Sequence, residues 1–370
     1  MTISPASLAQ IVARAQIQRL SLIGLAKNVG KTTATNHLLQ SFMDDRLYRP
    51  GELALTSLGL DGEATDAMTG LPKPRYVPQT GLLIATTDDL LRQAEGEGAR
   101  FERLQQLPGR TAIGPVFLAR VQHAGRIIIA GPTLLRDLSF ALSRFSTSGA
   151  RLSIVDGAIN RLGAAAPAVT DACILCTGAS VAATPELVAR RTVDVLTRLM
   201  TRQSTFADAY MKFQAQARLL CFSPIVSDHI TLFTGTSEPE QEARWIVAQM
   251  NMSERMIYFL HGALTEELTR ALLTQLPQQF AGQPAELVIE DPTRMFCHSV
   301  TLQRLAARGL AIRVARTVRV LAITINPYTP DYQCFSQQLL DALLRELPEN
   351  YPPVIDVISG IFHGQSSVTS

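Results

Sequence analysis

Residues 20–33 read LSLIGLAKNVGKTT and join an apolar run, a glycine-containing loop and the start of a helical pattern. The apolar run at residues 20–24 is typical of a buried β-strand, and residues 32–43 have the spacing of a helix. Gly30-Lys31-Thr32 stands where that helix would begin. A glycine, a lysine and a hydroxyl at the amino end of a helix are typical of a loop that binds phosphate groups.

The residue types in this loop match what phosphates require. Gly30 allows the backbone to approach a phosphate closely, Lys31 reaches the terminal phosphates, and the Thr32 hydroxyl is placed to bind Mg²⁺. A helix start that contains Gly-Lys-Thr by chance is the alternative without function. The strand before the loop and the helix after it argue against that alternative. The predicted nucleotide-binding residues are Lys27, Asn28, Val29, Gly30, Lys31, Thr32 and Thr33.

An acidic residue follows a second apolar run. Asp156 comes directly after residues 152–155, which are predicted to form a buried strand. Ligands of open α/β sheets bind at the carboxyl ends of the strands, and a carboxylate there can hold the Mg²⁺ bound by Thr32. We therefore assign catalytic roles to Lys31 and Asp156 and metal-binding roles to Thr32 and Asp156. An ordinary Asp-Gly turn is the structural alternative.

A second acid and several cations are further candidates. Asp61 is predicted as a metal ligand, although Glu63 could serve instead, and a glycine-rich loop with solvated acids is the alternative. Arg161 could meet a phosphate or a partner carboxylate, or lie on the surface. Lys27, Lys73 and Arg75 could form a cationic substrate pocket beside the γ-phosphate. The guanine signature Asn-Lys-x-Asp does not occur, which favours ATP over GTP.

Apolar runs alternate with helical stretches along the chain, the pattern of a parallel α/β sheet. In the first half, strands are predicted at residues 20–24, 53–58, 126–130, 152–155 and 172–177, and helices at residues 32–43, 88–95, 134–145 and 185–200. In the second half, strands are predicted at residues 256–260, 287–289, 320–325 and 354–358, and helices at residues 266–275, 300–308 and 334–347. Thr265 is expected to cap a helix, and Asn326-Pro327 to form a turn.

This alternation predicts an α/β fold with a mostly parallel sheet flanked by helices. We expect a nucleotide-binding domain at residues 1–200, a connector at residues 201–221 and a second, smaller α/β domain at residues 222–370. At 370 residues, the chain is long enough for two to three domains of about 150 residues each.

Composition excludes several classes of protein. With 34 Lys and Arg against 32 Asp and Glu, the formal charge is +2, which argues against a nucleic-acid binder. An uncharged run such as residues 172–185 is shorter than the about 18 residues of a membrane-spanning helix. Five cysteines argue against a disulfide framework, and Cys173 and Cys176 are three apart on a predicted strand, so they face opposite sides. We expect a cytoplasmic protein without a zinc site.

The spacing Gly24-x₅-Gly30-Lys31-Thr32 resembles that of dethiobiotin synthetase and the cobyrinate-type synthetases. These belong to the P-loop NTPase class, which also includes nitrogenase iron protein and the septum-site ATPases. In the common form of the motif four residues separate the glycines, whereas here five do. The synthetases carry a strand ending in Glu-Gly-Ala whose carboxylate binds Mg²⁺, and residues 156–158 have the same layout with aspartate.

The resemblance to the synthetases implies ATP and Mg²⁺ as ligands and, as one alternative, ligation of a small carboxylate. The chain departs from their pattern because no lysine stands at the end of the strand predicted at residues 53–58. Members that dimerise across ATP carry another lysine, which would fall at Ala26, and Lys27 is one residue away. A homodimer is therefore one possible arrangement.

Several segments together resemble a narrower family, the P-loop subunit of the reactivase of adenosylcobalamin-dependent lysine 5,6-aminomutase. These segments are residues 26–33, 56–63, 155–161, 170–172, 262–265 and 323–327. The resemblance implies that ATP binding or hydrolysis drives a conformational change in a partner aminomutase, which then releases damaged cofactor. A third alternative is nucleotide binding without hydrolysis.

Overall fold

The computed structural model describes residues 7–59, 75–157, 162–214, 216–224, 230–250, 255–278, 282–328 and 336–364. The chain divides into two compact units. Met1–Thr192 and Arg319–Ser370 form the first unit, and Val193–Val318 form the second. In chain order, the second unit is therefore an insertion into the first.

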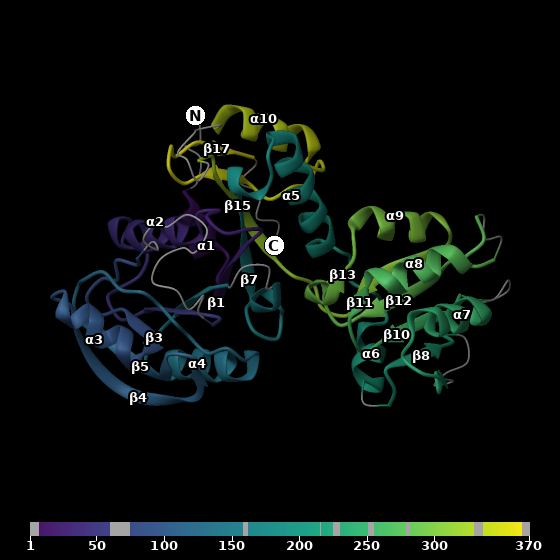
Figure 1. The fold of residues 1–370 in the computed structure, drawn as a ribbon, viewed down its shortest axis with the longest axis horizontal. Helices are drawn as coiled ribbons and strands as arrows, with labels where there is room; N and C mark the ends of the chain where they lie inside the picture. The colour runs from purple at the N-terminus through teal and green to yellow at the C-terminus, as the bar shows by residue number, and fades with distance from the viewer. Residues whose placement is uncertain are drawn as a thin grey trace. The chain divides into compact units, whose positions relative to one another are not determined.

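The first unit is built on a ten-stranded sheet (Figure 1). All neighbouring pairs from β16 to β3 are parallel, and the outer strands β17, β5 and β4 pair in antiparallel fashion. In spatial order the strands are β17 (Phe362–His363), β16 (Val354–Asp356), β15 (Val320–Asn326), β7 (Ala172–Gly178), β1 (Arg19–Gly24), β6 (Leu152–Asp156), β2 (Leu53–Ser57), β3 (Leu83–Thr87), β5 (Gly114–His123) and β4 (Arg100–Thr111).

Helices cover this sheet on both faces. Every residue of β2, β6 and β7 is buried, as in parallel sheets that are covered on both sides. The helices that belong to the first unit wholly or in part are α1 (Leu8–Arg14), α2 (Lys31–Asp44), α3 (Asp88–Gly96), α4 (Leu135–Thr147), α5 (Pro185–Leu199) and α10 (Ser336–Glu346), with short 3₁₀ turns η1 (Leu162–Ala165) and η2 (Ala179–Val181). The fold is thus α/β, with a large, mostly parallel sheet flanked by helices, as predicted.

The amphipathic pattern of α4 shows how the helices attach to the sheet. Leu138, Ala141, Leu142 and Phe145 are buried and recur at helical spacing. They pack with Ala54, Leu83 and Val155 of the strands in one apolar cluster. A period of three to four residues places these side chains on a single stripe of the helix, which the sheet removes from water.

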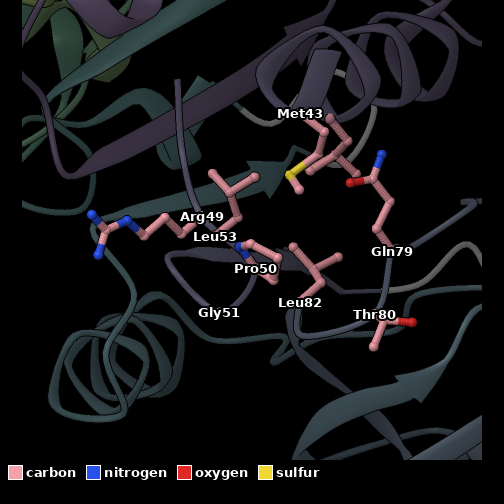
Figure 2. A pocket seen from close by; sticks show the side chains of 9 residues that line it. Met43, Arg49, Pro50, Gly51, Leu53, Gln79, Thr80 and Leu82 are labelled. Carbon is pink, nitrogen blue, oxygen red and sulfur yellow. The ribbon is translucent and has the colours of Figure 1, made fainter. Parts of the chain in front are cut away.

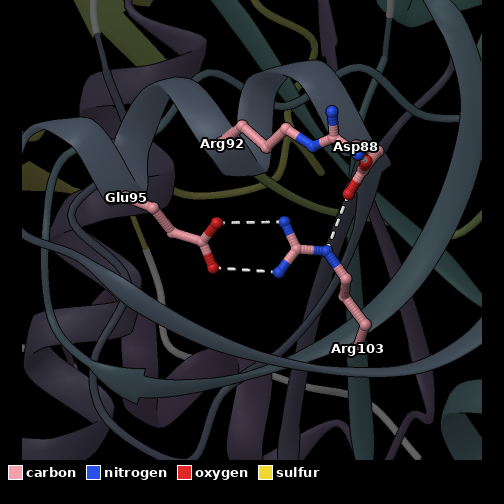
Figure 3. A network of polar contacts seen from close by, with 4 residues as sticks. All are labelled: Asp88, Arg92, Glu95 and Arg103. Atoms are coloured by element: carbon pink, nitrogen blue, oxygen red, sulfur yellow. Dashed lines mark hydrogen bonds and ion pairs between the residues drawn. The ribbon is translucent and has the colours of Figure 1, made fainter.

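A network of ion pairs ties α3 to the antiparallel edge of the sheet (Figure 3). Arg103 of β4 donates two hydrogen bonds to Glu95, at 2.9 and 3.0 Å, and one to Asp88 at 2.7 Å. The hydrogen bond from Arg103 holds the pKa of Glu95 below its ordinary value. The paired, two-pronged geometry fixes the direction of the Arg103 side chain, which is what a guanidinium group does better than an ammonium group. This network joins the edge strand β4 to α3, whose first residue, Asp88, directly follows β3.

The second unit contains a five-stranded sheet with its own core. β14 (Leu310–Val314), β12 (Ala285–Ile289) and β10 (Ile257–Leu260) are parallel, and β8 (Leu219–Phe222) and β9 (Ile230–Leu232) complete the sheet in antiparallel fashion. Its other elements are α6 (Ala207–Phe213), α7 (Pro239–Gln249), α8 (Glu266–Gln275), α9 (Ser299–Ala307), η3 (Pro292–Arg294) and the pair β11 (Leu264–Thr265) and β13 (Met295–Phe296). Thr265 caps α8 as predicted, since its hydroxyl accepts a hydrogen bond from the Leu268 N–H.

The division of the chain differs from the predicted one. The domain predicted at residues 222–370 is wrong for residues 319–370, because β15 pairs with β7 and thereby joins the first sheet. The predicted connector, residues 201–221, contains α6 and most of β8 of the second unit. The strand predicted at residues 126–130 is also wrong, since there only Ile127 forms a bridge, with Tyr76. Both units show the same alternation of strands and helices, and an apolar strand pattern does not specify the partner strand.

None of the helices in the described parts of the chain is both long and apolar enough to span a lipid bilayer.

Because β15 pairs with β7, we expect the stability of the first unit to depend on Ile323 of β15. This side chain is fully buried and lies opposite Leu175. Ile323→Ala should destabilise the first unit by about 2–5 kcal/mol, because it leaves a cavity beside β7. Hydrogen exchange should show faster exchange of the β7 amides. The control is Ile289→Ala in β12, which should instead lower protection in the second unit. Unchanged β7 exchange in Ile323→Ala would contradict the observed pairing.

We expect His261, directly after β10, to make the stability of the second unit depend on pH. Its ring lies 4.4 Å from the ring of Tyr210, and neither ring nitrogen has a hydrogen-bond partner among the described residues. Desolvation by burial lowers the pKa of His261 to about 4. The folded state therefore favours the neutral imidazole. Its contribution to stability is complete above the unfolded-state pKa of about 6.5 and is lost as the pH falls towards 4.

Lowering the pH from 7 to 4.5 should therefore reduce the urea midpoint of the second unit. Trp245 in α7 is the single tryptophan of the chain, so its fluorescence reports this transition. His261→Phe should reduce the pH dependence, because phenylalanine cannot be protonated and fits the aromatic contacts. An equal shift in wild type and variant would show that other groups cause it.

Candidate functional site

The loop at residues 25–33 follows β1 and leads directly into α2, as predicted from the sequence. The Leu25 N–H donates to the Cys176 carbonyl at 3.1 Å, which fixes the start of the loop on β7. Asn28 and Gly30 have φ angles of +60° and +83°, in the left-handed region. α2 begins at Lys31, and its first turn closes with the Ala34 N–H donating to the Gly30 carbonyl at 2.8 Å. The left-handed conformation at Gly30 explains why a glycine precedes the helix.

The Lys31 side chain folds back across the loop to the end of β1. A Cβ atom added at Gly24 would lie 2.9 Å from Lys31 Nζ and 2.8 Å from Val29 Cγ2. A residue with a side chain at position 24 would displace the lysine, so this close approach requires glycine. Val29 is itself buried and anchors the loop from within. The ammonium group thus lies beside the loop backbone at the amino end of α2, where the helix dipole also favours an anion.

Asp156 lies at the same edge of the sheet. It ends β6, where its register partners are Leu22 of β1 and Ser57 of β2, and its residue is only 8% exposed. The Tyr76 hydroxyl donates a hydrogen bond to Asp156 Oδ2. A side-chain interaction with Thr32 lowers the pKa of the same phenol, so Thr32 also lies close to it. Thr32 and Asp156 therefore converge on one hydroxyl group, and the structure brings these two predicted residues together.

Tyr76 is a site residue that the sequence analysis missed. It is buried, and its backbone pairs with Ile127 through hydrogen bonds of 2.8 and 3.0 Å. Burial, followed by the charge of Asp156, raises the pKa of Tyr76 well above its ordinary value. The phenol therefore stays protonated and acts as a donor to the carboxylate. No local pattern marks Tyr76, because the pairing that positions it joins residues 51 positions apart.

Cys176 also lies near the loop. Neither its thiol nor that of Cys173 is reactive. Burial raises the pKa of Cys176 to about 12, while a hydrogen bond with Thr324 and the charge of Lys31 lower it. Burial also raises the pKa of Cys173 far above its ordinary value. Both thiols are free and fully buried within β7. They stay protonated and therefore offer no thiolate to a metal.

The other predicted residues divide into two groups. Thr33 is exposed in the first turn of α2, and Lys27 is half-buried in the loop. Arg75 forms an ion pair with Glu97 beyond the end of α3. Asp61, Glu63, Lys73 and Arg161 lie outside the described residues.

A small hollow elsewhere in the first unit is separate from this site (Figure 2). It lies at the amino ends of β2 and β3, whereas the loop follows the carboxyl end of β1. Its lining is mostly apolar. The lining residues are Leu39, Met43, Arg49, Pro50, Gly51, Leu53, Gln79, Thr80 and Leu82.

The oxygen donors near the loop are of the kind that Mg²⁺ prefers. The described residues contain no cluster of three or more histidine, cysteine or acidic side chains that could hold a metal. Mg²⁺ needs few protein ligands, because it keeps several waters and binds substrate phosphates. A hydroxyl from Thr32 and a carboxylate from Asp156, brought together at Tyr76, are hard oxygen ligands of the required kind.

Comparison with known proteins identifies no relative: no family model matches the chain, and neither the curated proteins nor the solved structures contain a match.

The contact between Tyr76 and Asp156 predicts a measurable coupling. Tyr76→Phe should lower the free energy of unfolding by about 1–3 kcal/mol, because it removes a hydrogen bond to a buried carboxylate. Urea unfolding of Tyr76→Phe, Asp156→Asn and the double variant would measure the coupling free energy. The two substitutions should be clearly non-additive. Additive effects would show that the contact contributes nothing to stability.

Proposed function

We propose that the first unit binds Mg²⁺-ATP at residues 25–33 and that the protein is an ATPase that acts as a conformational switch on a partner enzyme. The observation that carries this proposal is the path of Lys31, whose side chain returns over Gly24 to the start of the loop. This arrangement places an ammonium group, loop amides and a helix amino terminus around one small volume. All three favour a polyphosphate.

The proposed roles follow from position. The loop amides and Lys31 bind the β- and γ-phosphates, and Lys31 offsets the negative charge that develops during phosphoryl transfer. Thr32 and Asp156 hold Mg²⁺, directly or through water. Asp156 can also orient the water that attacks the γ-phosphate, since it lies at the same edge of the sheet. On the basis of these features together, we also propose that the fold belongs to the P-loop NTPase class.

For the partner, we propose an adenosylcobalamin-dependent aminomutase. The support for this finer step is the resemblance of residues 26–33 and 155–161 to the reactivase subunit described above. A switch needs two conformations that the γ-phosphate distinguishes. Tyr76 is suited to report the occupancy of the site, because its hydroxyl contacts both Thr32 and Asp156.

The ligase alternative requires free cations beside the γ-phosphate. Arg75, one of the candidates, is paired with Glu97. This contact argues against Arg75 as one of these cations. The switch and the ligase differ in what stimulates ATP turnover, which is a partner protein in one case and a small carboxylate in the other.

Site variants test the proposal directly. Lys31→Ala should weaken ATP binding by at least about 100-fold, because it removes a half-buried charge that we propose pairs with the phosphates. Asp156→Asn should retain ATP binding but lose most Mg²⁺-dependent phosphate release. The matched control is Lys212→Ala in α6 of the second unit, which removes the same charge and should leave both properties unchanged. Calorimetric titration and a phosphate-release assay provide the measurements.

The switch itself is tested by adding a purified aminomutase whose cofactor has been inactivated. The basal turnover of ATP should be slow and should rise in the presence of this partner. Failure of the wild-type protein to bind ATP with Mg²⁺ would overturn the proposal. Binding and hydrolysis that no aminomutase stimulates would overturn the partner while leaving the ATPase intact.

A further inference from the structure

Two carbonyl groups of the loop are held by side chains that lie far away in the sequence. The Ser180 hydroxyl donates to the Lys27 carbonyl at 2.7 Å. The Asn326 side-chain amide donates to the Asn28 carbonyl at 2.6 Å. The two hydrogen bonds hold successive peptide groups at the top of the loop.

The same pair of strands positions both donors. Asn326 is the last residue of β15, where it pairs with Gly178 at the end of β7. Ser180 follows two residues later, in η2. Asn326 is held in turn, because its side-chain carbonyl accepts a hydrogen bond from the Tyr328 N–H at 3.3 Å. Its Cβ also lies 3.1 Å from the position that a Cβ of Gly30 would occupy, so it packs against the start of α2.

Holding a carbonyl also fixes the direction of the next amide. In a planar trans peptide group, the C=O of one residue and the N–H of the following residue point in opposite directions. Ser180 therefore directs the Asn28 N–H away from η2, and Asn326 directs the Val29 N–H away from β15. Asn28 also has a left-handed backbone, which is uncommon for a residue with a side chain, and the bond to its carbonyl stabilises that conformation.

We propose that Ser180 and Asn326 are positioning residues of the phosphate site. By holding the Lys27 and Asn28 carbonyls, they turn the next two amides towards the phosphate chain of a bound nucleoside triphosphate. Amide donors that already point at the anion lose little freedom when the anion binds. The hydrogen bonds from Ser180 and Asn326, called the clamp below, therefore raise the affinity although neither side chain touches the ligand. This inference rests on the proposed function, since it assigns a cause to the anion affinity of the same loop.

The test compares Ser180→Ala and Asn326→Ala with the wild-type protein, with Mg²⁺-ATP and Mg²⁺-tripolyphosphate as probes. Each variant should raise the dissociation constant of both probes by about 2- to 10-fold, the usual effect of one lost hydrogen bond. Asn326→Asp should cause a larger loss, because a carboxylate would repel both the Asn28 carbonyl and the phosphates. The amides of Asn28 and Val29 should exchange faster with solvent in the variants.

A matched control removes a similar bond from the neighbouring strand. The Ser336 hydroxyl donates to Asp356 Oδ2 at 2.9 Å, at the end of β16. Ser336→Ala should leave the affinity for both probes within about twofold, since it touches no part of the loop. Should Asn326→Ala fail to fold, Ser180→Ala alone carries the same test, because its side chain is small and only partly buried.

The outcomes separate the inference from the proposed function. Unchanged affinity in both clamp variants, with a large loss in Lys31→Ala, would overturn the inference alone. A loss for ATP but not for tripolyphosphate would also overturn it, because it would place Asn326 at the nucleoside instead. If the wild-type protein binds neither probe, the proposed function and the inference both fail.

Discussion

The parallel pairing of β1 with β6 on one side and β7 on the other positions the loop and the acidic residue of the candidate site. All three strands are almost completely buried, so their backbone groups must pair with one another. The registers place Leu22 opposite Asp156 and Gly24 opposite Cys176. The carboxyl ends of the three strands therefore meet at one edge. The loop after β1, the Asp156 carboxylate and the buried Cys176 thiol lie at this edge because the strand registers place them there.

Local features of the site could be predicted because their signals are local. The loop is a strand end, a glycine–lysine pair and a helix start within a few residues, and the structure has these elements at the expected positions. The position of Asp156 at a strand end followed from the apolar run before it. The α/β class followed in the same way, since continuous apolar strands that alternate with helices leave few other architectures. Whether the loop binds ATP stays a prediction.

Tyr76 and Asn326 could not be predicted, because their contacts join distant parts of the chain. Tyr76 reaches Asp156 across 80 positions, and Asn326 reaches Asn28 across 298. Asn326 followed by proline looks like an ordinary turn, and nothing near it in the sequence indicates a partner. The domain boundary was wrong for the same reason. The strand at residues 320–326 continues the alternation of the second unit, yet it completes the first sheet.

Ser180 and Asn326 stand on either side of the inserted second unit along the chain. Ser180 lies shortly before α5, the helix in which the chain passes from the first unit to the second. β15, which carries Asn326, begins directly after the chain returns to the first unit. Along the chain, Ser180 therefore precedes one covalent connection and Asn326 follows the other. Linkage is reciprocal: if displacement of a connection weakens phosphate binding, phosphate binding must resist that displacement equally. A unit appended at a chain end has one connection, whereas an inserted unit has two, and here the chain segment on each side of the insertion carries one of the two donors.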